Sequence, residues 1–143
     1  MKYFTIQELT YSSTAVAKRI DNTPPPEIKV KLMALVNNCL DPIREKWGKP
    51  INVNSGFRCP TLNNDKDIKG VPTSQHTKGE AADITAGSPR ENERLFNMII
   101  AMRVAGEIEY DQLIDESGKS KIPYSWIHIS YKSSGNRGQQ LHL

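Results

Sequence analysis

The segment that decides the fold is 73–84, TSQHTKGEAADI, which carries a histidine at position 76 and an aspartate at position 83. It begins as a polar loop and ends in small and branched residues, which predict a short strand over 81–85. In such a strand Ile84 points into the core and Asp83 points away from it. His76 precedes the strand on a loop that contains Gly79. The segment therefore offers an imidazole and a carboxylate to one place, as a metal site requires.

The composition is that of a globular chain with one domain. Its 143 residues are 37% hydrophobic and 24% charged, which is enough apolar material for a core. The net charge of +3 is small and the basic residues are spread along the chain, so nucleic acid is not an expected partner. No apolar run approaches the roughly 20 residues of a membrane helix, so no membrane partner is expected. We expect a monomeric domain over 1–143 with its ordered core at about 4–131.

The N-terminus and the cysteines both indicate synthesis in the cytoplasm. The opening residues MKYFTIQELTYSS lack the basic, apolar and small-residue regions of a signal peptide, so action outside the cell needs another exit route. Cys39 and Cys59 allow one disulfide at most. Short cytoplasmic chains rarely keep disulfides, and we therefore expect two free thiols.

Residue patterns predict helices mixed with short strands. Apolar residues at three- and four-residue steps predict a long helix from Glu27, kinked or broken late at Pro42. The sequence SPRE at 88–91 is a strong helix start, and that helix should run to Gly106. Strands are expected over 51–54, 81–85, 110–116 and 125–131, short helices over 4–9 and 14–20, and an irregular loop over 56–71. The predicted fold class is α+β, with helices packed on a small, mostly antiparallel sheet.

A second histidine lies in the strand pattern WIHISY at 126–131. Alternation places Trp126 and His128 on one face, toward a cleft, and the two isoleucines on the core face. With His76 and Asp83, His128 completes a set of two imidazoles and one carboxylate that leaves a fourth position open, the pattern of a catalytic zinc. Each residue alone also has an ordinary explanation, as a satisfied polar residue in a strand or as a turn former.

Four segments in this order, SGFRCPTLN, SQHTKGEAADI, YDQLI and SWIHISY, resemble the M15 family of zinc peptidases. The family includes D-alanyl-D-alanine carboxypeptidases and peptidoglycan endopeptidases, and the similarity is greatest to the branch called the M15A C-terminal domain. The resemblance runs from about Phe4 to Tyr131. The signature SxHxxGxAxD and the later Trp-x-His element are matched by Ser74, His76, Gly79, Ala81, Asp83, Trp126 and His128.

This resemblance implies a fold, a metal and a substrate. His76, Asp83 and His128 would bind Zn²⁺ on the concave face of an antiparallel sheet with helices behind. The two imidazoles and the carboxylate suit zinc but do not exclude another divalent ion. The substrate would be the stem peptides of bacterial peptidoglycan, cut by a carboxypeptidase or an endopeptidase. A phage or prophage product, reaching the wall by lysis or on a virion, fits the N-terminus, and so does a cytoplasmic dipeptidase-like enzyme.

Three further residues are candidates for binding the substrate. The resemblance implies that Arg58 lies near the carboxylate of the substrate or the developing oxyanion, and a guanidinium can hold a carboxylate with two parallel hydrogen bonds. The simpler role of Arg58 is to hold its own loop together. Ser74 could donate to a ligand or to the substrate, or only shape its loop. Trp126 is the third candidate, because it shares a strand face with His128.

The chain departs from the family at the general base. Many relatives carry an acidic residue three positions before the last histidine, where this chain has Ser125. A serine hydroxyl does not accept a proton from water at neutral pH without help, so another carboxylate acts or activity is weak or lost. Glu116 lies on one face of its strand, and Asp111 and Asp115 lie on the other. Glu116 also follows QLI with one residue between them, at a position where this branch commonly has an acid. It is our predicted catalytic base.

A different class of function also fits the sequence. A non-catalytic wall-binding or phage structural module could keep the fold and the zinc, and Ser125 supports this alternative. The intact set of three ligands argues against it, because ligands drift once catalysis is lost. The remaining histidine, His142, lies in a stretch with little pattern and is expected to belong to a disordered tail rather than to the metal site.

Overall fold

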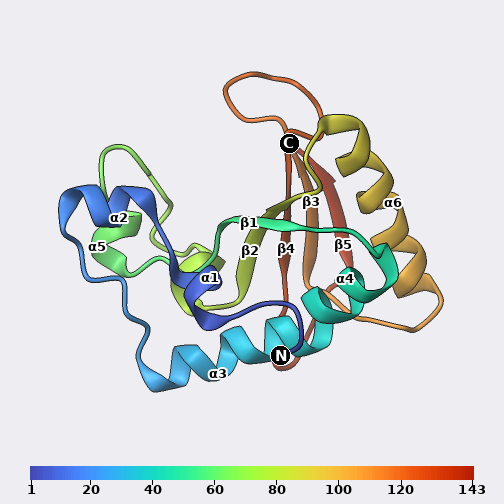
Figure 1. Ribbon diagram of the computed structural model, residues 1–143, viewed down its shortest axis with the longest axis horizontal. Helices are drawn as coiled ribbons and strands as arrows, with labels where there is room; N and C mark the ends of the chain where they lie inside the picture. Colours follow the sequence, from blue (N-terminus) through green and yellow to red (C-terminus); the bar gives the residue numbers. More distant parts are fainter.

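The computed structural model describes residues 1–143 and shows helices packed against a single sheet (Figure 1). The strands are β1 (Asn52–Ser55), β2 (Ala81–Thr85), β3 (Gln112–Glu116), β4 (Trp126–Ser130) and β5 (Gln139–His142). They lie in the order β1-β2-β4-β3-β5, and only the pairing of β3 with β5 is parallel. The predicted α+β class with a mostly antiparallel sheet is confirmed.

Three of the helices begin at a hydroxyl side chain that caps the first turn. The helices are α1 (Ile6–Thr10), α2 (Ser13–Lys18), α3 (Pro26–Leu35), α4 (Asp41–Trp47), α5 (Pro60–Asn63) and α6 (Pro89–Val104), with a π-helical turn η1 (Val36–Leu40) and a 3₁₀ turn η2 (Gln75–Lys78). The Ser88 hydroxyl accepts a hydrogen bond from the backbone of Glu91 at 3.2 Å. This bond satisfies an otherwise unpaired donor in the first turn of α6, as the SPRE pattern predicts.

The predicted break in the long helix is present, but it lies one turn before the proline. α3 runs into the wider turn η1, and α4 then starts with Pro42 in its first turn. A proline has no backbone donor and its ring crowds the carbonyl four residues earlier, so the preceding turn must widen or break. α4 ends at Gly48, which adopts a φ of 73°.

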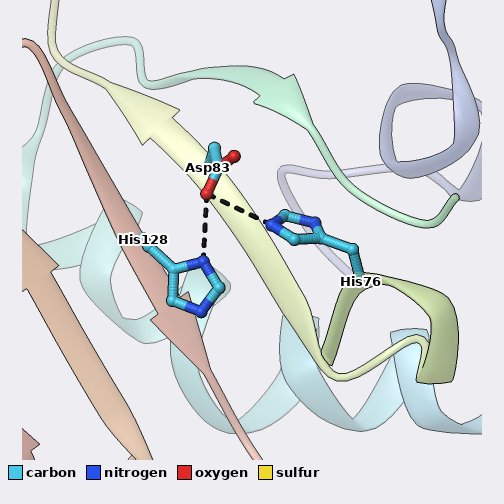
Figure 2. A group of neighbouring side chains, drawn as sticks. All are labelled: His76, Asp83 and His128. Atoms are coloured by element: carbon cyan, nitrogen blue, oxygen red, sulfur yellow. Dashed lines mark hydrogen bonds and ion pairs between the residues drawn. The ribbon is translucent and has the colours of Figure 1, made fainter. Parts of the chain in front are cut away.

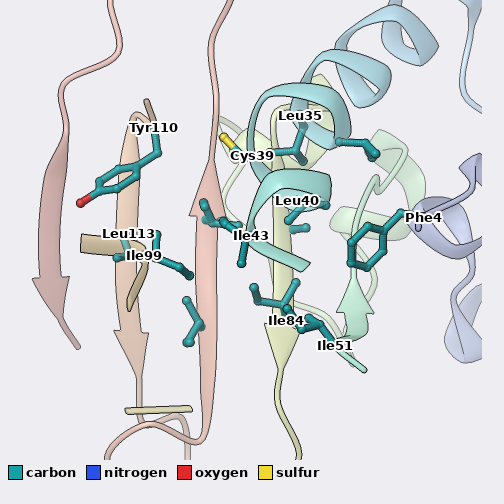
Figure 3. Packing of buried hydrophobic residues seen from close by; sticks show 14 of the residues in the cluster. Phe4, Leu35, Cys39, Leu40, Ile43, Ile51, Ile84, Ile99, Tyr110 and Leu113 are labelled. Atoms are coloured by element: carbon teal, nitrogen blue, oxygen red, sulfur yellow. The ribbon is translucent and has the colours of Figure 1, made fainter. Parts of the chain in front are cut away.

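The core lies between one face of the sheet and the helical layer formed by α3, η1, α4 and α6 (Figure 3). Strands and helices contribute alternating or periodic apolar residues to it: Ile84, Leu113, Ile127 and Ile129 from the sheet, and Leu35, Leu40, Ile43, Leu95 and Ile99 from the helices. Because neighbours in a strand point to opposite faces, Asp83 and His128 emerge on the face away from these helices. No helix combines the length and apolar character needed to cross a membrane.

Two expectations about irregular structure are wrong. The loop over 56–71 contains the short helix α5, and the supposed tail forms β5 along β3. His142 is therefore ordered, with its Nδ1 2.9 Å from Asp115 Oδ2 and its ring 5.4 Å from that of Phe96. The sequence of β5, QQLH, is polar and short because it forms an edge, and such strands carry little periodic signal.

Both cysteines are free thiols, as predicted. Cys39 is fully buried in η1, and its Sγ lies 3.1 Å from the carbonyl oxygen of Glu109. Burial, with a smaller contribution from the negative charge of Glu109, raises the pKa of Cys39 to about 12. Cys59 is only half-buried, at the start of α5.

Candidate metal centre

The three predicted ligands converge on the sheet face opposite the helical layer (Figure 2). His76 comes from η2, Asp83 from β2 and His128 from β4. Asp83 Oδ1 lies between the two rings, 3.3 Å from His76 Nε2 and 3.1 Å from His128 Nδ1. The potential ligand atoms of all three residues lie within 4.8 Å of one another. One small cation could therefore contact all of them.

Strand register and a tight turn bring these side chains together. Asp83 is paired directly with His128 across β2 and β4, and opposite residues in an antiparallel pair share a face. Between η2 and β2 the chain reverses at Gly79, which has a φ of 71°. A Cβ there would approach a side-chain carbon of Ile28 to 2.8 Å, so the reversal that returns His76 to the sheet requires glycine.

The backbone behind His76 fixes its orientation. His76 Nδ1 lies 2.7 Å from the carbonyl oxygen of Gly56, which can only accept a hydrogen bond. The proton therefore lies on Nδ1, and the lone pair on Nε2 faces Asp83. A Cβ on Gly56 would lie 2.2 Å from the backbone oxygen of Leu9, so only glycine allows the chain to approach closely enough.

The charge balance of the group fits a divalent cation. The lone pair of His76 Nε2 and the carboxylate of Asp83 face each other at 3.3 Å with no hydrogen between them. Two imidazole nitrogens and a carboxylate oxygen are the donor set that Zn²⁺ prefers. The residues present therefore fit this metal.

A cleft of about 380 Å³ is lined by His128, one of the three predicted ligands, and by Glu116. Glu116 lies on the same side of the sheet as His128 and Ile114, which also line the cleft. Burial, and then the negative charge of Asp83, raises the pKa of Glu116. A carboxyl group with a raised pKa beside a metal centre is suited to accept and return a proton.

The other candidate bases are occupied by structural contacts. Asp111 accepts hydrogen bonds from Arg137 Nε at 2.9 Å and Arg137 Nη2 at 2.8 Å. Asp115 accepts from the backbone of Tyr124 at 2.6 Å and contacts His142. The Ser125 hydroxyl donates to the carbonyl of Ile122 at 2.6 Å, within the loop between β3 and β4. These contacts leave Glu116 as the acid that faces the cleft, although its role as the base stays a prediction.

The predicted substrate-binding residues lie around the site in different ways. Arg58 is half-buried and donates to Asn63 Oδ1 at 3.2 Å, Ser55 Oγ at 3.4 Å and Ser74 Oγ at 3.4 Å. Burial lowers the pKa of Arg58 and the charge of Asp83 opposes this effect. Ser74 lines the cleft, so Arg58 adjoins the site through it. The roles of both residues in substrate binding stay predictions.

Trp126 does not line the cleft, although it lies opposite Glu116 in the pairing of β3 with β4. Its ring lies over Gly118, where a Cβ would approach the ring to 2.6 Å. This contact packs the turn between β3 and β4. A contact of Trp126 with the substrate stays a prediction.

Six polar residues that line the cleft were not predicted as site residues: Thr73, Gln75, Lys78, Gln112, Lys132 and Arg137. Gln75 lies inside the signature, between Ser74 and His76, and this position was the one available signal for it. Lys132 and Arg137 lie beyond the last predicted strand. Nothing in the sequence shows that β5 returns this stretch to the site.

A comparison with protein families supports the resemblance to M15 peptidases. The family described as Peptidase M15 matches residues 2–114. A search of the curated proteins gives no match. The matched range includes His76 and Asp83 and ends before Glu116 and His128, whose positions follow from the register of β4. Because the match spans most of the chain, the chain belongs to the M15 peptidase family, which implies a metallopeptidase acting on peptides, and the group of His76, Asp83 and His128 could hold its metal.

Proposed function

We propose that this protein is a zinc-dependent peptidase that cuts the stem peptides of bacterial peptidoglycan. The observation that carries the proposal is the group of His76, Asp83 and His128 at the edge of a cleft that also contains Glu116. The proposal includes delivery to the cell wall through lysis or on a virion. Both a carboxypeptidase and an endopeptidase are consistent with an open cleft.

The residues divide the chemistry of amide hydrolysis among them. When bound, Zn²⁺ supplies the Lewis acidity that activates water and polarises the scissile carbonyl. The Glu116 carboxylate takes the proton from the attacking water and gives it to the leaving amine. Arg58, fixed by Ser55, Asn63 and Ser74, stabilises negative charge on the substrate or in the transition state.

The charges of the cleft support a substrate with a carboxylate near the scissile bond. Lys78, Lys132 and Arg137 line the cleft together with Glu116. Arg137 is engaged by Asp111, whereas Lys78 is exposed and Lys132 lies 4.0 Å from Asp111. A stem peptide that ends in a carboxylate could pair with these lysines, because such pairs gain from mutual attraction at the mouth of a cleft.

The alternative is a wall-binding module without activity. The observation that favours it is Ser125, whose hydroxyl is directed into a loop at the position where relatives carry the base. Both functions share the fold and the metal. They differ in whether a bond is broken.

Incubation of the metal-loaded protein with purified peptidoglycan separates the two functions. Released D-alanine and shortened muropeptides are quantified for the wild type, Glu116→Gln and His128→Ala, with the metal content of each. Glu93→Gln is the control, because Glu93 is an exposed glutamate on α6. The peptidase proposal expects cutting by the wild type and control, loss of metal in His128→Ala, and retained metal without cutting in Glu116→Gln. A wild type that binds zinc but cuts no fragment supports the wall-binding alternative.

A further inference from the structure

A series of hydrogen bonds leads from the far side of His128 to an ion pair between the buried Asp111 and the half-exposed Arg137. His128 Nε2 lies 3.3 Å from Gln75 Oε1, and Gln75 Nε2 donates to Asp111 Oδ2 at 2.8 Å. Asp111 is completely buried and accepts two hydrogen bonds from the Arg137 side chain and one from its backbone, the last at 3.1 Å. None of these contacts is used by the peptidase chemistry above.

The Asp111 carboxylate, the acceptor at the end of this series, sets the direction of each hydrogen bond between it and His128. A carboxylate only accepts, so Gln75 must turn its amide nitrogen to Asp111 and its oxygen to His128. An amide oxygen also only accepts, so the proton of His128 must lie on Nε2. The lone pair of His128 is then on Nδ1, which is the nitrogen 3.1 Å from Asp83 Oδ1.

The ion pair of Asp111 with Arg137 keeps this direction fixed. The hydrogen bond from Arg137 lowers the pKa of Asp111 to about 2, with further lowering contributions from the backbone of Arg137 and from Gln75. Asp111 therefore stays ionised, as an acceptor, at any pH near neutrality. The same role is played for His76 by the carbonyl of Gly56, which is a backbone group and needs no such support.

We propose that Gln75 is a positioning residue, held by Asp111 and Arg137, which presents Nδ1 of His128 to the metal by binding the proton on Nε2. Outer partners of metal-binding histidines typically contribute about 10- to 100-fold to metal affinity. The inference rests on the metal site of the proposed function and does not depend on which peptide bond is cut.

The test measures zinc affinity by competition with a chromophoric chelator. We expect Gln75→Met to bind zinc about 10- to 100-fold more weakly than the wild type, because His128 loses its outer acceptor. Gln112→Met is the matched control, since Gln112 lines the same cleft but pairs with Gln139. The double variant Gln75→Glu with Asp111→Asn restores an acceptor to His128 and a donor to that acceptor, so its affinity should return to within a few-fold of the wild type.

A spectroscopic measurement separates positioning from a loss of folding. Long-range ¹⁵N–¹H spectra of the zinc-loaded wild type should show His128 with its proton on Nε2 and the metal on Nδ1. Circular dichroism establishes that each variant is folded before its affinity is compared. Wild-type affinity in folded Gln75→Met, or a zinc-loaded His128 that carries its proton on Nδ1, would overturn the inference. Zinc affinity and the protonation of His128 can both be measured in a protein that cuts no peptidoglycan. Failure of this inference is therefore distinguishable from failure of the peptidase proposal.

Discussion

Replacement of Asp111 by asparagine should destabilise the fold in a manner that depends on pH. The pKa of Asp111 is lowered from an ordinary value of 3.8 to about 2, chiefly by the Arg137 side chain. Such a difference corresponds to about 2 kcal/mol of stability at neutral pH. Because half of the Arg137 side chain is exposed and screened by solvent, we expect a loss of roughly 1–2 kcal/mol.

The direction of the pH dependence follows from the lowered pKa. The wild type has the full contribution of Asp111 above the unfolded pKa of 3.8 and loses it as the pH falls toward about 2. Urea unfolding at pH 7 and near pH 2.5 should therefore show a gap between the wild type and Asp111→Asn that narrows in acid. Asp67→Asn is the control, because Asp67 forms an exposed pair with Lys18. A gap of the same size at both pH values, or none at pH 7, would refute the reasoning.

Three further predictions concern single residues. In metal-free protein, Glu116→Gln should raise the melting temperature at pH 7, because the pKa of Glu116 is raised and its ionisation in the cleft opposes folding. Thermal unfolding in EDTA should show this advantage vanish below about pH 4, where both side chains are neutral; an advantage that persists in acid would contradict the explanation. A thiol reagent should label Cys59 in the native protein and Cys39 only after unfolding, as counted by mass spectrometry, since Cys39 is buried with a pKa of about 12. Gly56→Ala should cost about 1–3 kcal/mol in urea unfolding by forcing the chain off Leu9, and zinc affinity should fall with it; unchanged stability would show that the close approach is relieved elsewhere.

The sequence predicted those parts of the fold in which local patterns match the tertiary structure. The strand over 81–85 and the start of α6 at Ser88 were placed correctly, because alternation and capping are properties of short segments. The two histidines and Asp83 were recognised as a group by residue type and by resemblance. Their convergence on one face followed from strand alternation.

Other parts depend on pairings between distant segments and could not be read locally. β5 has no apolar alternation, and its pairing with β3 alone makes it a strand. The contact of Gln75 with Asp111 joins η2 to the residue before β3, which no periodicity reveals. The turn η1 lies before Pro42 because the proline ring crowds the carbonyl four residues earlier, which is a local effect that the prediction placed one turn too late.

The strand order has a consequence for the order of events as the chain is synthesised. Both neighbours of β3, the strands β4 and β5, follow it in the sequence, so β3 emerges without a partner. β4 must then enter between β2 and β3, which joins two halves of the sheet in a single late step. His128 arrives with that strand, so a nascent chain that already holds His76 and Asp83 has an incomplete centre. Zinc binding can therefore stabilise the chain only once β4 has been inserted. The earlier steps of folding must be stabilised by packing of the apolar layer alone.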